Sequence, residues 1–178
     1  HATELNANLE VKLIPVLAAM EEKGILLDKA FFEKFSQELQ EQLARLEQQI
    51  YDHVGERFNI NSTQQLSDVL FKRLGLEPPD RSRKTSSGKL STAAGVLEAM
   101  RGQHPIIGEI LDYRELTKLK STYVDALPQQ INPKTGRVHT SFNQTGTVTG
   151  RIASQDPNLQ NIPTRTELGN RVRQGFVA

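Results

Sequence analysis

Residues 28–55, DKAFFEKFSQELQEQLARLEQQIYDHVG, carry an apolar side chain at every third or fourth position. This spacing places the apolar residues on one face of an α-helix of about seven turns. The stripe consists of Phe31, Phe35, Leu39, Leu43, Leu46, Ile50 and Val54. Asp28 can cap the start of this helix, and Gly55 can end it. The pattern predicts a helix from Lys29 to about His53 that forms one arm of an antiparallel helix pair.

A shorter helix is predicted before the long one. Leu9–Lys23 has helical periodicity and is followed by Gly24, a residue that commonly ends helices. Pro15 either kinks this helix or marks its true start. Ile25–Leu27 then forms a short extended link to the long helix.

A helix-start signature follows the long helix. Asn61 or Ser62 can cap the next helix, and Gln64 or Gln65 can reach back toward the cap, as in a capping box. The helix then runs through an apolar pattern to Gly75, where it is expected to end.

Two more helices are predicted after a basic loop. The loop, residues 77–92, is rich in Pro, Ser and Gly and reads EPPDRSRKTSSGKLST. Ser91 or Thr92 is expected to cap a short helix that ends near Arg101. Pro105–Leu127 forms the last long helix.

Strand patterns replace helix patterns after residue 128. Val138, Thr140 and Phe142 alternate with polar residues, which predicts a strand, and Val148–Ile152 is its expected partner. Residues 167–178 read as a short helix followed by the apolar start of a strand. We therefore expect an α+β protein that is predominantly α, and its apolar end indicates a piece of a longer chain.

Composition excludes several classes of protein. The chain has 178 residues, 37% of them hydrophobic, and no cysteine, so neither disulfides nor thiolate metal sites are expected. None of its four histidines has a partner at metal-ligand spacing, and no metal site is predicted. The longest apolar run, Leu13–Met20, is too short to cross a bilayer, and the first residues show no signal-peptide pattern. A cytoplasmic protein with no membrane partner is expected.

The net charge of +1 conceals an uneven distribution. Residues 1–56 carry a net charge of −6, residues 57–110 carry +3, and residues 111–178 carry +4. The basic part can face a polyanion, although ordinary solvated surface explains the same distribution.

Two basic features are candidate phosphate sites. Arg114, Lys118 and Ser121 fall on one face of the predicted 105–127 helix, where they can follow a phosphate backbone. The basic loop leads into the predicted helix start at Ser91 and Thr92, and helix starts attract phosphates. A solvated amphipathic helix and an ordinary surface loop remain the alternatives.

The stretch TGRIASQDPNLQNIP, residues 149–163, has an unusual excess of amides. It contains Arg151 and four side-chain amides, those of Gln155, Asn158, Gln160 and Asn161. Amide and guanidinium donors suit the minor groove of a duplex, where all four base pairs present acceptors in similar places. The alternative is a polar turn whose amides bond its own backbone.

No complete catalytic site is visible in the residues. His139 has no adjacent serine or cysteine in a nucleophile motif, and there is no Gly-rich phosphate loop. Carboxylates in residues 111–178 are isolated from one another, whereas a two-metal site needs a converging pair. This pattern is typical of a binding segment.

Four stretches together resemble the family A DNA polymerases, the bacterial DNA polymerase I type. They are LIPVLAAMEEKGILLD, FNINSTQQLSDVLFKRLGL with KTSSGKLSTAAGVLEAM, YRELTKLKSTYVDALPQQINPKTGRVHTSFNQT, and TGRIASQDPNLQNIPTRTELGNRVRQGFVA. They cover nearly the whole chain in the family's order. The family commonly has TGRLSS where this chain has Thr149–Ser154, TGRIAS, and the replacements are mild.

The resemblance implies a division into two parts. Residues 1–130 would be a thumb of long antiparallel helices, with a small helical tip at about 56–104. Residues 131–178 would be the first part of the palm, with a short β-hairpin and strands, ending before the family's catalytic aspartate motif.

The resemblance also implies a set of DNA-binding residues. The thumb tip and the helix at the thumb base would hold the primer–template backbone through Asn61, Ser62, Lys84, Lys89, Ser91, Thr92, Arg114, Lys118 and Ser121. The palm segment would contact the minor groove near the primer terminus through Arg151, Asn158, Gln160, Asn161 and Arg165.

The implied enzyme is a DNA-directed DNA polymerase, a nucleotidyltransferase of DNA replication and repair that uses two Mg²⁺ ions. Its metal ligands, its catalytic residues and its dNTP site would lie outside this chain. The remainder of the palm and the fingers are expected in the same chain or in a companion chain. The 178-residue chain alone is therefore predicted to be inactive.

Two other readings compete with the polymerase segment. One is a non-catalytic module that binds duplex DNA, and the other is a helical interaction domain with no affinity for DNA. Salt-dependent binding of duplex DNA would exclude the helical interaction domain, because phosphate contacts release counterions. Both the polymerase segment and the non-catalytic module would show such binding.

Overall fold

The structure, a computed structural model, describes residues 10–80, 82, 85 and 88–177. It is mostly helical, with short antiparallel strands in two small sheets, which confirms the predicted predominantly α fold class. The chain divides into two compact units. The middle unit is Gln37–Lys118, and the terminal unit combines the residues up to Ser36 with those from Leu119 onward.

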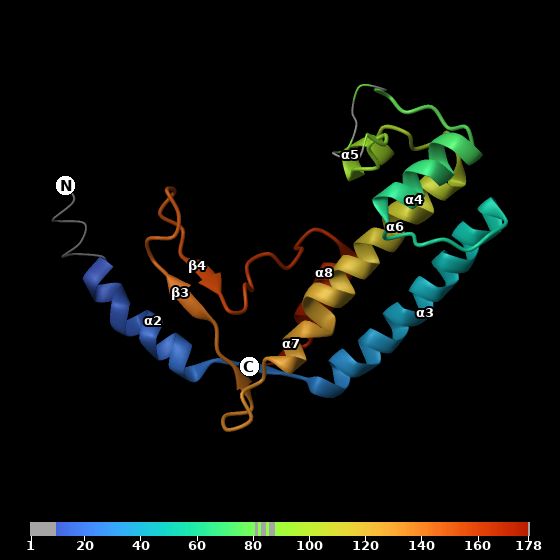
Figure 1. The fold of residues 1–178 in the computed structure, drawn as a ribbon. Coiled ribbons are helices and arrows are strands. Elements are labelled where there is room, and N and C mark those ends of the chain that lie inside the picture. The colour runs from blue at the N-terminus through green and yellow to red at the C-terminus, as the bar shows by residue number, and fades with distance from the viewer. Residues whose placement is uncertain (1–9, 81, 83–84, 86–87, 178) are drawn as a thin grey trace. The chain divides into compact units, whose positions relative to one another are not determined.

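The long helix forms as predicted and contributes to both units. Helix α3 spans Lys29–Val54, and Gly55 follows it with a φ of 77° (Figure 1). Asp28 Oδ1 accepts a hydrogen bond from the Phe31 amide at 2.9 Å, which is the expected cap. The structure corrects one residue of the predicted apolar stripe. Phe32 is fully buried and its ring lies edge-on to Phe176, whereas Phe31 is only partly buried.

Helix α3 makes one side-chain contact to the later helical segments within each unit. At its start, the Ser36 hydroxyl donates to Asp125 Oδ1 at 2.7 Å in the terminal unit. At its end, His53 Nε2 lies 3.2 Å from Glu109 Oε1 in the middle unit.

A three-stranded antiparallel sheet joins distant parts of the terminal unit. Its order is β2 (Arg137–Val138), β1 (Ile25–Leu27) and β5 (Phe176–Val177). The predicted link at 25–27 is therefore a central strand, between helix α2 (Val11–Lys23) and α3. Gly24 ends α2 at a φ of 62°, and a Cβ there would collide with His139 and the Val138 carbonyl.

A second sheet corrects the predicted hairpin. Strand β3 (Ser141–Asn143) pairs with β4 (Ala153–Gln155), so the prediction of 148–152 as the partner is wrong. Val148 is fully exposed, and the Thr147 hydroxyl donates to the Arg151 carbonyl at 2.7 Å to close a turn. Helix α8 (Glu167–Gln174) follows as expected, capped by Thr166.

The middle unit packs small helices on the end of α3 and the start of α6 (Pro105–Leu119). These small helices are α4 (Thr63–Asp68), the π-helical η2 (Val69–Arg73) and α5 (Ala94–Glu98). The buried cluster includes Ile50, Ile60, Leu66, Leu70, Leu97, Met100, Ile106, Ile107 and Ile110.

The caps of the small helices match the sequence only in part. Ser62 caps α4 by accepting from the Gln65 amide at 3.4 Å, and Gln65 Oε1 accepts from the Asn59 amide at 2.8 Å. The expected cap at Ser91 or Thr92 is wrong, because α5 begins after Ala93 and has no side-chain cap.

The predicted helix from Pro105 to Leu127 is interrupted. After α6 the chain forms the π-helix η3 (Lys120–Val124), and α7 (Ala126–Gln129) then continues past Pro128. Among the described residues, no helix is long and apolar enough to span a membrane.

Candidate nucleic-acid interface

The amide-rich stretch, residues 149–163 and here named the amide loop, is partly held by its own side chains. Gln160 Oε1 accepts from the Ser154 amide at 3.1 Å, and Gln160 Nε2 donates to the Ile152 carbonyl at 2.5 Å. Asn158 Oδ1 accepts from the Gln160 amide at 3.0 Å. The side chains of Gln160 and Asn158 therefore bond the backbone of their own loop, as expected for a polar turn.

Two hydroxyl groups fasten the amide loop to the rest of the terminal unit. Tyr123 of η3 donates to the Asn161 carbonyl at 2.5 Å, and burial raises the pKa of its phenol. The buried Thr140 hydroxyl lies 2.7 Å from the Pro157 carbonyl and 3.0 Å from the Gln155 carbonyl. These contacts define the position of the loop backbone relative to η3.

An open pocket of about 520 Å³ lies between the amide loop and the helical segments η3 and α7. The helical side contributes Thr122, Tyr123 and Leu127, with Gln130 just beyond α7, and the loop side contributes Gln155, Asp156, Pro157, Asn158 and Asn161. Within the described part of the chain, the side-chain amides of Gln155 and Asn161 have no hydrogen-bond partner. They can therefore bond an external ligand.

Two exposed guanidinium groups flank this region in sequence. Arg151 and Arg165 are both exposed, and neither guanidinium has a partner among residues 10–80, 82, 85 and 88–177. Each can present the planar fork that suits a base edge or a phosphate.

Arg114 has an intramolecular role in the middle unit. Its Nη1 donates to the Thr92 carbonyl at 2.5 Å, and its Nη2 donates to Thr92 Oγ1 at 3.3 Å. Burial lowers the pKa of Arg114, and Thr92 itself is buried. Since a guanidinium has five N–H donors, Arg114 keeps others for a ligand. The same contacts explain why Thr92 does not cap α5.

Lys89 is also engaged within the middle unit. Its Nζ lies 2.7 Å from both carboxylate oxygens of Asp68, and Lys72 Nζ lies 2.7 Å from Asp68 Oδ1. Hydrogen bonds from Lys72 and then from Lys89 lower the pKa of Asp68. Two ammonium groups share one carboxylate, so this cluster keeps a surplus positive charge.

Three other residues that were predicted to bind DNA make local contacts in turns and helix caps. The Asn61 amide donates to Asn59 Oδ1 at 3.0 Å, and the Ser91 hydroxyl accepts from the Ala93 amide at 3.3 Å. Ser62 is the α4 cap, as described above. These residues are placed by the start of α4 and the approach to α5. Lys84 lies outside the described residues.

The predicted track along the last long helix is altered by η3. Lys118 at the end of α6 and Ser121 in η3 are exposed. The π-helical spacing shifts the following residues relative to an α-helical face. Asp125, which follows η3, accepts from Lys120 Nζ at 2.7 Å and from the Ser36 hydroxyl. The α-helical geometry assumed for the predicted face therefore ends at Leu119, before Ser121.

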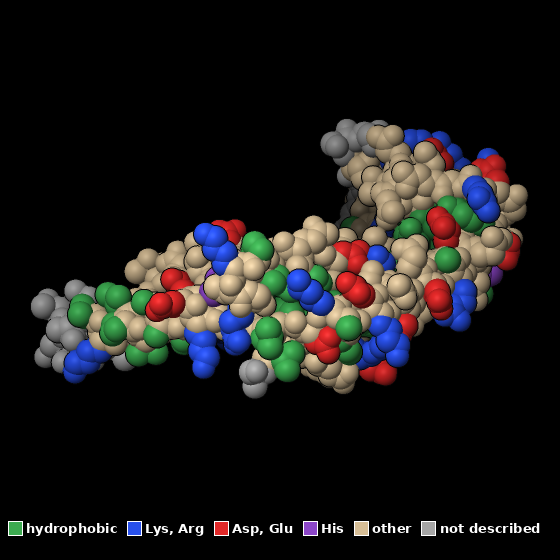
Figure 2. Space-filling view, turned by 90° about the horizontal axis from the view of Figure 1, so that it is seen from below, with side chains coloured by type: hydrophobic (Ala, Val, Ile, Leu, Met, Phe, Trp, Pro, Cys, Tyr) green, Lys and Arg blue, Asp and Glu red, His purple; other side chains and the backbone are tan. Residues whose placement is uncertain are grey.

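Basic side chains do not form one uniform patch on the visible surface. On the face shown in Figure 2, Lys and Arg are interspersed with Asp and Glu. Sequence reasoning missed Tyr123 and Asp68 as site-forming residues. Nothing in the sequence spacing of Tyr123 indicated the hydrogen bond from its hydroxyl to the Asn161 carbonyl.

Metal chemistry finds no support in the donors present. Among the described residues, no group of three or more His, Cys, Asp or Glu side chains could hold a metal ion. These residues therefore do not fit a two-metal centre, and no reaction step is assigned to them.

Comparison with known proteins relates this geometry to one family. The profile of DNA polymerase family A matches residues 29–178. The thermostable DNA polymerase I of Thermus filiformis is 55% identical over 174 residues, covering 98% of this chain and 21% of the relative. DNA polymerase I of Chloroflexus aurantiacus is 51% identical over 176 residues, covering 98% of this chain and 19% of the relative.

A solved structure agrees with the sequence relatives. The POL domain of Pol1 from M. smegmatis, in complex with DNA primer-template and dNTP, superposes with a TM-score of 0.83 at 39% identity. The match covers 98% of this chain and 30% of that one. The chain spans about a fifth of the length of the curated relatives it matches. It belongs to DNA polymerase family A.

Proposed function

We propose that this chain is the primer–template-binding segment of a DNA-directed DNA polymerase. The observation that carries the proposal is a set of side-chain donors with no partner among the described residues, presented by a family A chain: Gln155, Asn161, Arg151 and Arg165. The mycobacterial relative, whose POL domain was solved with DNA primer-template and dNTP, supports DNA as the partner. The thumb comprises residues 1–130, with its tip at about 56–104, and the palm begins at 131.

The amide loop inspects the minor groove in this proposal. Asn161 donates from its side chain to a purine N3 or a pyrimidine O2, acceptors that every correct base pair offers in similar positions. Arg151 and Arg165 supply further donors and positive charge. Gln160 and Asn158, whose acceptor oxygens bond the loop backbone, hold the loop in shape and contact DNA through their remaining donors.

The phosphate contacts come from exposed polar residues on the helices and in the tip. Lys118 and Ser121 contact the backbone of the duplex, since both are exposed along the α6–η3 run. Lys89 adds a cation whose charge is shared with Asp68, and Arg114 uses donors that Thr92 leaves over. Such contacts position a duplex without reading its sequence.

The chemical step belongs to the rest of the polymerase. Two Mg²⁺ ions, held by ligands outside the described residues, would stabilise the charge that develops as the nucleotidyl group is transferred. The dNTP would bind through that remainder, in the same or a companion chain. A cytoplasmic site of action suits replication and repair. The 178-residue chain by itself is expected to bind DNA and to extend no primer.

A titration with primer–template duplex tests the proposed division of labour. Lys118→Ala should weaken binding for every duplex sequence and lower the slope of log K against log salt by about 1. Asn161→Ala should leave that slope unchanged, since an uncharged donor releases no counterion. In the intact polymerase, Asn161→Ala should instead slow extension from the primer terminus.

The control and the contradicting results are equally direct. Lys34→Ala removes an exposed lysine of α3 that has no predicted contact with DNA, so it should change neither affinity nor slope beyond a small long-range effect. Equal slopes for Lys118→Ala and Asn161→Ala would contradict the assignment of their roles. An affinity independent of salt would contradict duplex binding itself.

A further inference from the structure

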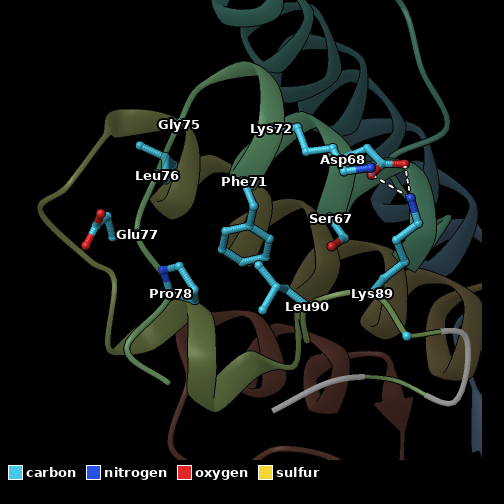
Figure 3. Close-up of a pocket in the computed structure, with 11 residues that line it drawn as sticks. Ser67, Asp68, Phe71, Lys72, Gly75, Leu76, Glu77, Pro78, Lys89 and Leu90 are labelled. Carbon is cyan, nitrogen blue, oxygen red and sulfur yellow. Dashed lines mark hydrogen bonds and ion pairs between the residues drawn. The ribbon is translucent and has the colours of Figure 1, made fainter. Parts of the chain in front are cut away.

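A second pocket, in the middle unit, combines an apolar wall with a charged end. It is open and has a volume of about 630 Å³. Its apolar lining consists of Phe71, Leu76, Pro78 and Leu90, all of them only partly buried. Figure 3 shows the Phe71 ring extending from η2 toward Pro78 and Leu90. A flat aromatic ring left partly open to solvent in this way can stack on a planar ligand.

The charged end is the cluster of Asp68, Lys72 and Lys89. Both ammonium groups lie 2.7 Å from Asp68 Oδ1. Dashed lines in Figure 3 mark the contacts between Lys89 and Asp68. One carboxylate neutralises one ammonium, so this end keeps about one positive charge near neutral pH. Each ammonium has three N–H donors, and Asp68 cannot occupy all of them. The cluster can therefore bind an anionic group.

The pocket is polarised along its length. Glu77 lines it away from the lysines, next to Leu76 and Pro78 (Figure 3). An anion is thus attracted to the lysine end, and the apolar wall lies between that end and Glu77. A matching ligand has a planar apolar body and one anionic group at its side.

We propose that this pocket binds one unpaired nucleotide of a DNA strand, with the base against Phe71 and a phosphate on Lys72 and Lys89. Stacking on an aromatic ring combined with a cation for the phosphate is the general chemistry of single-strand binding. The inference rests on the proposed function only in that a DNA-binding chain brings nucleotides near. A base inside a duplex is already stacked and cannot enter, so the site is specific for unpaired DNA.

Anisotropy with the 178-residue chain and labelled oligonucleotides tests the base contact. The probes are oligo-dT and an abasic strand of the same length, which has the same phosphates and no bases. The wild-type chain should bind oligo-dT roughly tenfold more tightly than the abasic strand. Phe71→Leu, which keeps an apolar side chain, should abolish that preference and leave duplex affinity unchanged. Equal wild-type affinities for the two strands would overturn the proposal.

A charge variant tests the phosphate contact independently of Phe71. Lys72→Glu should weaken binding of both single strands more than Lys34→Glu, which makes the same charge change on α3 outside the pocket. Equal effects of the two variants would overturn the phosphate contact. Circular dichroism checks that each variant folds, and Lys72, being exposed, provides a result even if Phe71→Leu does not fold.

Two further measurements separate a nucleotide site from a surface that binds something else. An oligonucleotide carrying 5-iododeoxyuridine should crosslink on irradiation to the peptide that contains Phe71, and crosslinks found only elsewhere would overturn the site. A peptide of alternating leucine and aspartate that displaced oligo-dT and bound more tightly would identify a protein partner instead. Loss of duplex binding alone would contradict the proposed function without affecting the preference for bases.

Discussion

Gln160 and Asn161 are adjacent amides of one loop with different surroundings. The Gln160 side chain joins the Ser154 amide to the Ile152 carbonyl, whereas the Asn161 side chain has no partner among the described residues. Sequence alone gives both residues the same donor and acceptor, so it could not separate them. Their distinction depends on the conformation of residues 152–154, which places a backbone donor and a backbone acceptor within reach of Gln160 only.

Replacing each amide in turn measures this difference. Gln160→Ala should lower the free energy of unfolding by about 1 kcal/mol, because two backbone groups lose their side-chain partner. Asn161→Ala should leave it unchanged within about 0.5 kcal/mol, since surface substitutions that remove no contact are nearly neutral. Urea denaturation followed by circular dichroism provides both values. Equal losses of stability would refute the structural role of Gln160.

Tyr51 is expected to make the free energy of unfolding depend on pH in the alkaline range. Burial and then the hydrogen bond to Glu47 raise its pKa to about 12, and its hydroxyl also lies 3.0 Å from the Phe58 carbonyl. The unfolded chain loses this proton near pH 10, while the folded chain keeps it. The unfolded state then binds fewer protons, so the contribution of Tyr51 is complete below pH 10 and declines as pH rises toward 12.

Tyr51→Phe isolates this contribution. At pH 8 the variant should be less stable by about 1 kcal/mol, the usual net value of a hydrogen bond. Between pH 10 and 12 the difference in the free energy of unfolding should shrink. In this range the wild type must take up a proton on Tyr51 when it folds, whereas the variant has no such group. Urea midpoints at several pH values measure it. A difference that stayed constant or grew across this range would contradict the raised pKa.

Helix α8 is the element that holds the far end of the amide loop. Thr166 caps it by accepting from the Gly169 amide at 3.1 Å. Gly169 is buried, and a Cβ there would overlap the carbonyl group of Pro163, the last residue of the loop. The glycine therefore lets the first turn of the helix lie directly against the loop. Pro163 is not adjacent to Gly169 in the sequence, so only the folded structure shows why residue 169 has to be small.

Gly169→Ala should separate the helix from the loop. We expect a loss of about 1–3 kcal/mol from overpacking, partly offset by the better helix propensity of alanine. Asn170→Ala, at the exposed next position of α8, is the matched control and should be neutral or slightly stabilising. In the intact polymerase, only Gly169→Ala should also impair primer extension. Similar stability in the two variants would show that Pro163 yields easily.

At the scale of the whole molecule, sequence predicted what local periodicity determines. Helix α3, its Asp28 cap and its end at Gly55 follow from spacing within the chain, and the four motif stretches indicated the family correctly. Strand pairing was harder, because β1 pairs with β5 across about 150 residues of chain. The π-helical segments were unpredictable for another reason, since an i→i+5 turn leaves no distinct apolar period in five residues.

Two helical connections cross the division between the units, and this should make unfolding cooperative. Helix α3 passes from Ser36 to Gln37 without interruption, and the α6–η3 run passes from Lys118 to Leu119. If one unit unfolded alone, each helix would be left with an exposed, unsatisfied end in the other unit. We therefore expect a single two-state transition despite the two compact units.

Tryptophan reporters can test that expectation because the chain has no tryptophan. Phe58→Trp places a probe in the middle unit, and Phe142→Trp places one in the terminal unit; both positions are partly buried. The two reporters should show the same urea midpoint. Ile110→Ala, which removes a fully buried side chain of the middle unit at a cost of about 2–5 kcal/mol, should lower both midpoints equally. A shift seen only by the Phe58→Trp reporter would mean that the units unfold separately. The helices that cross the division would then transmit little of the stability of the middle unit to the amide loop.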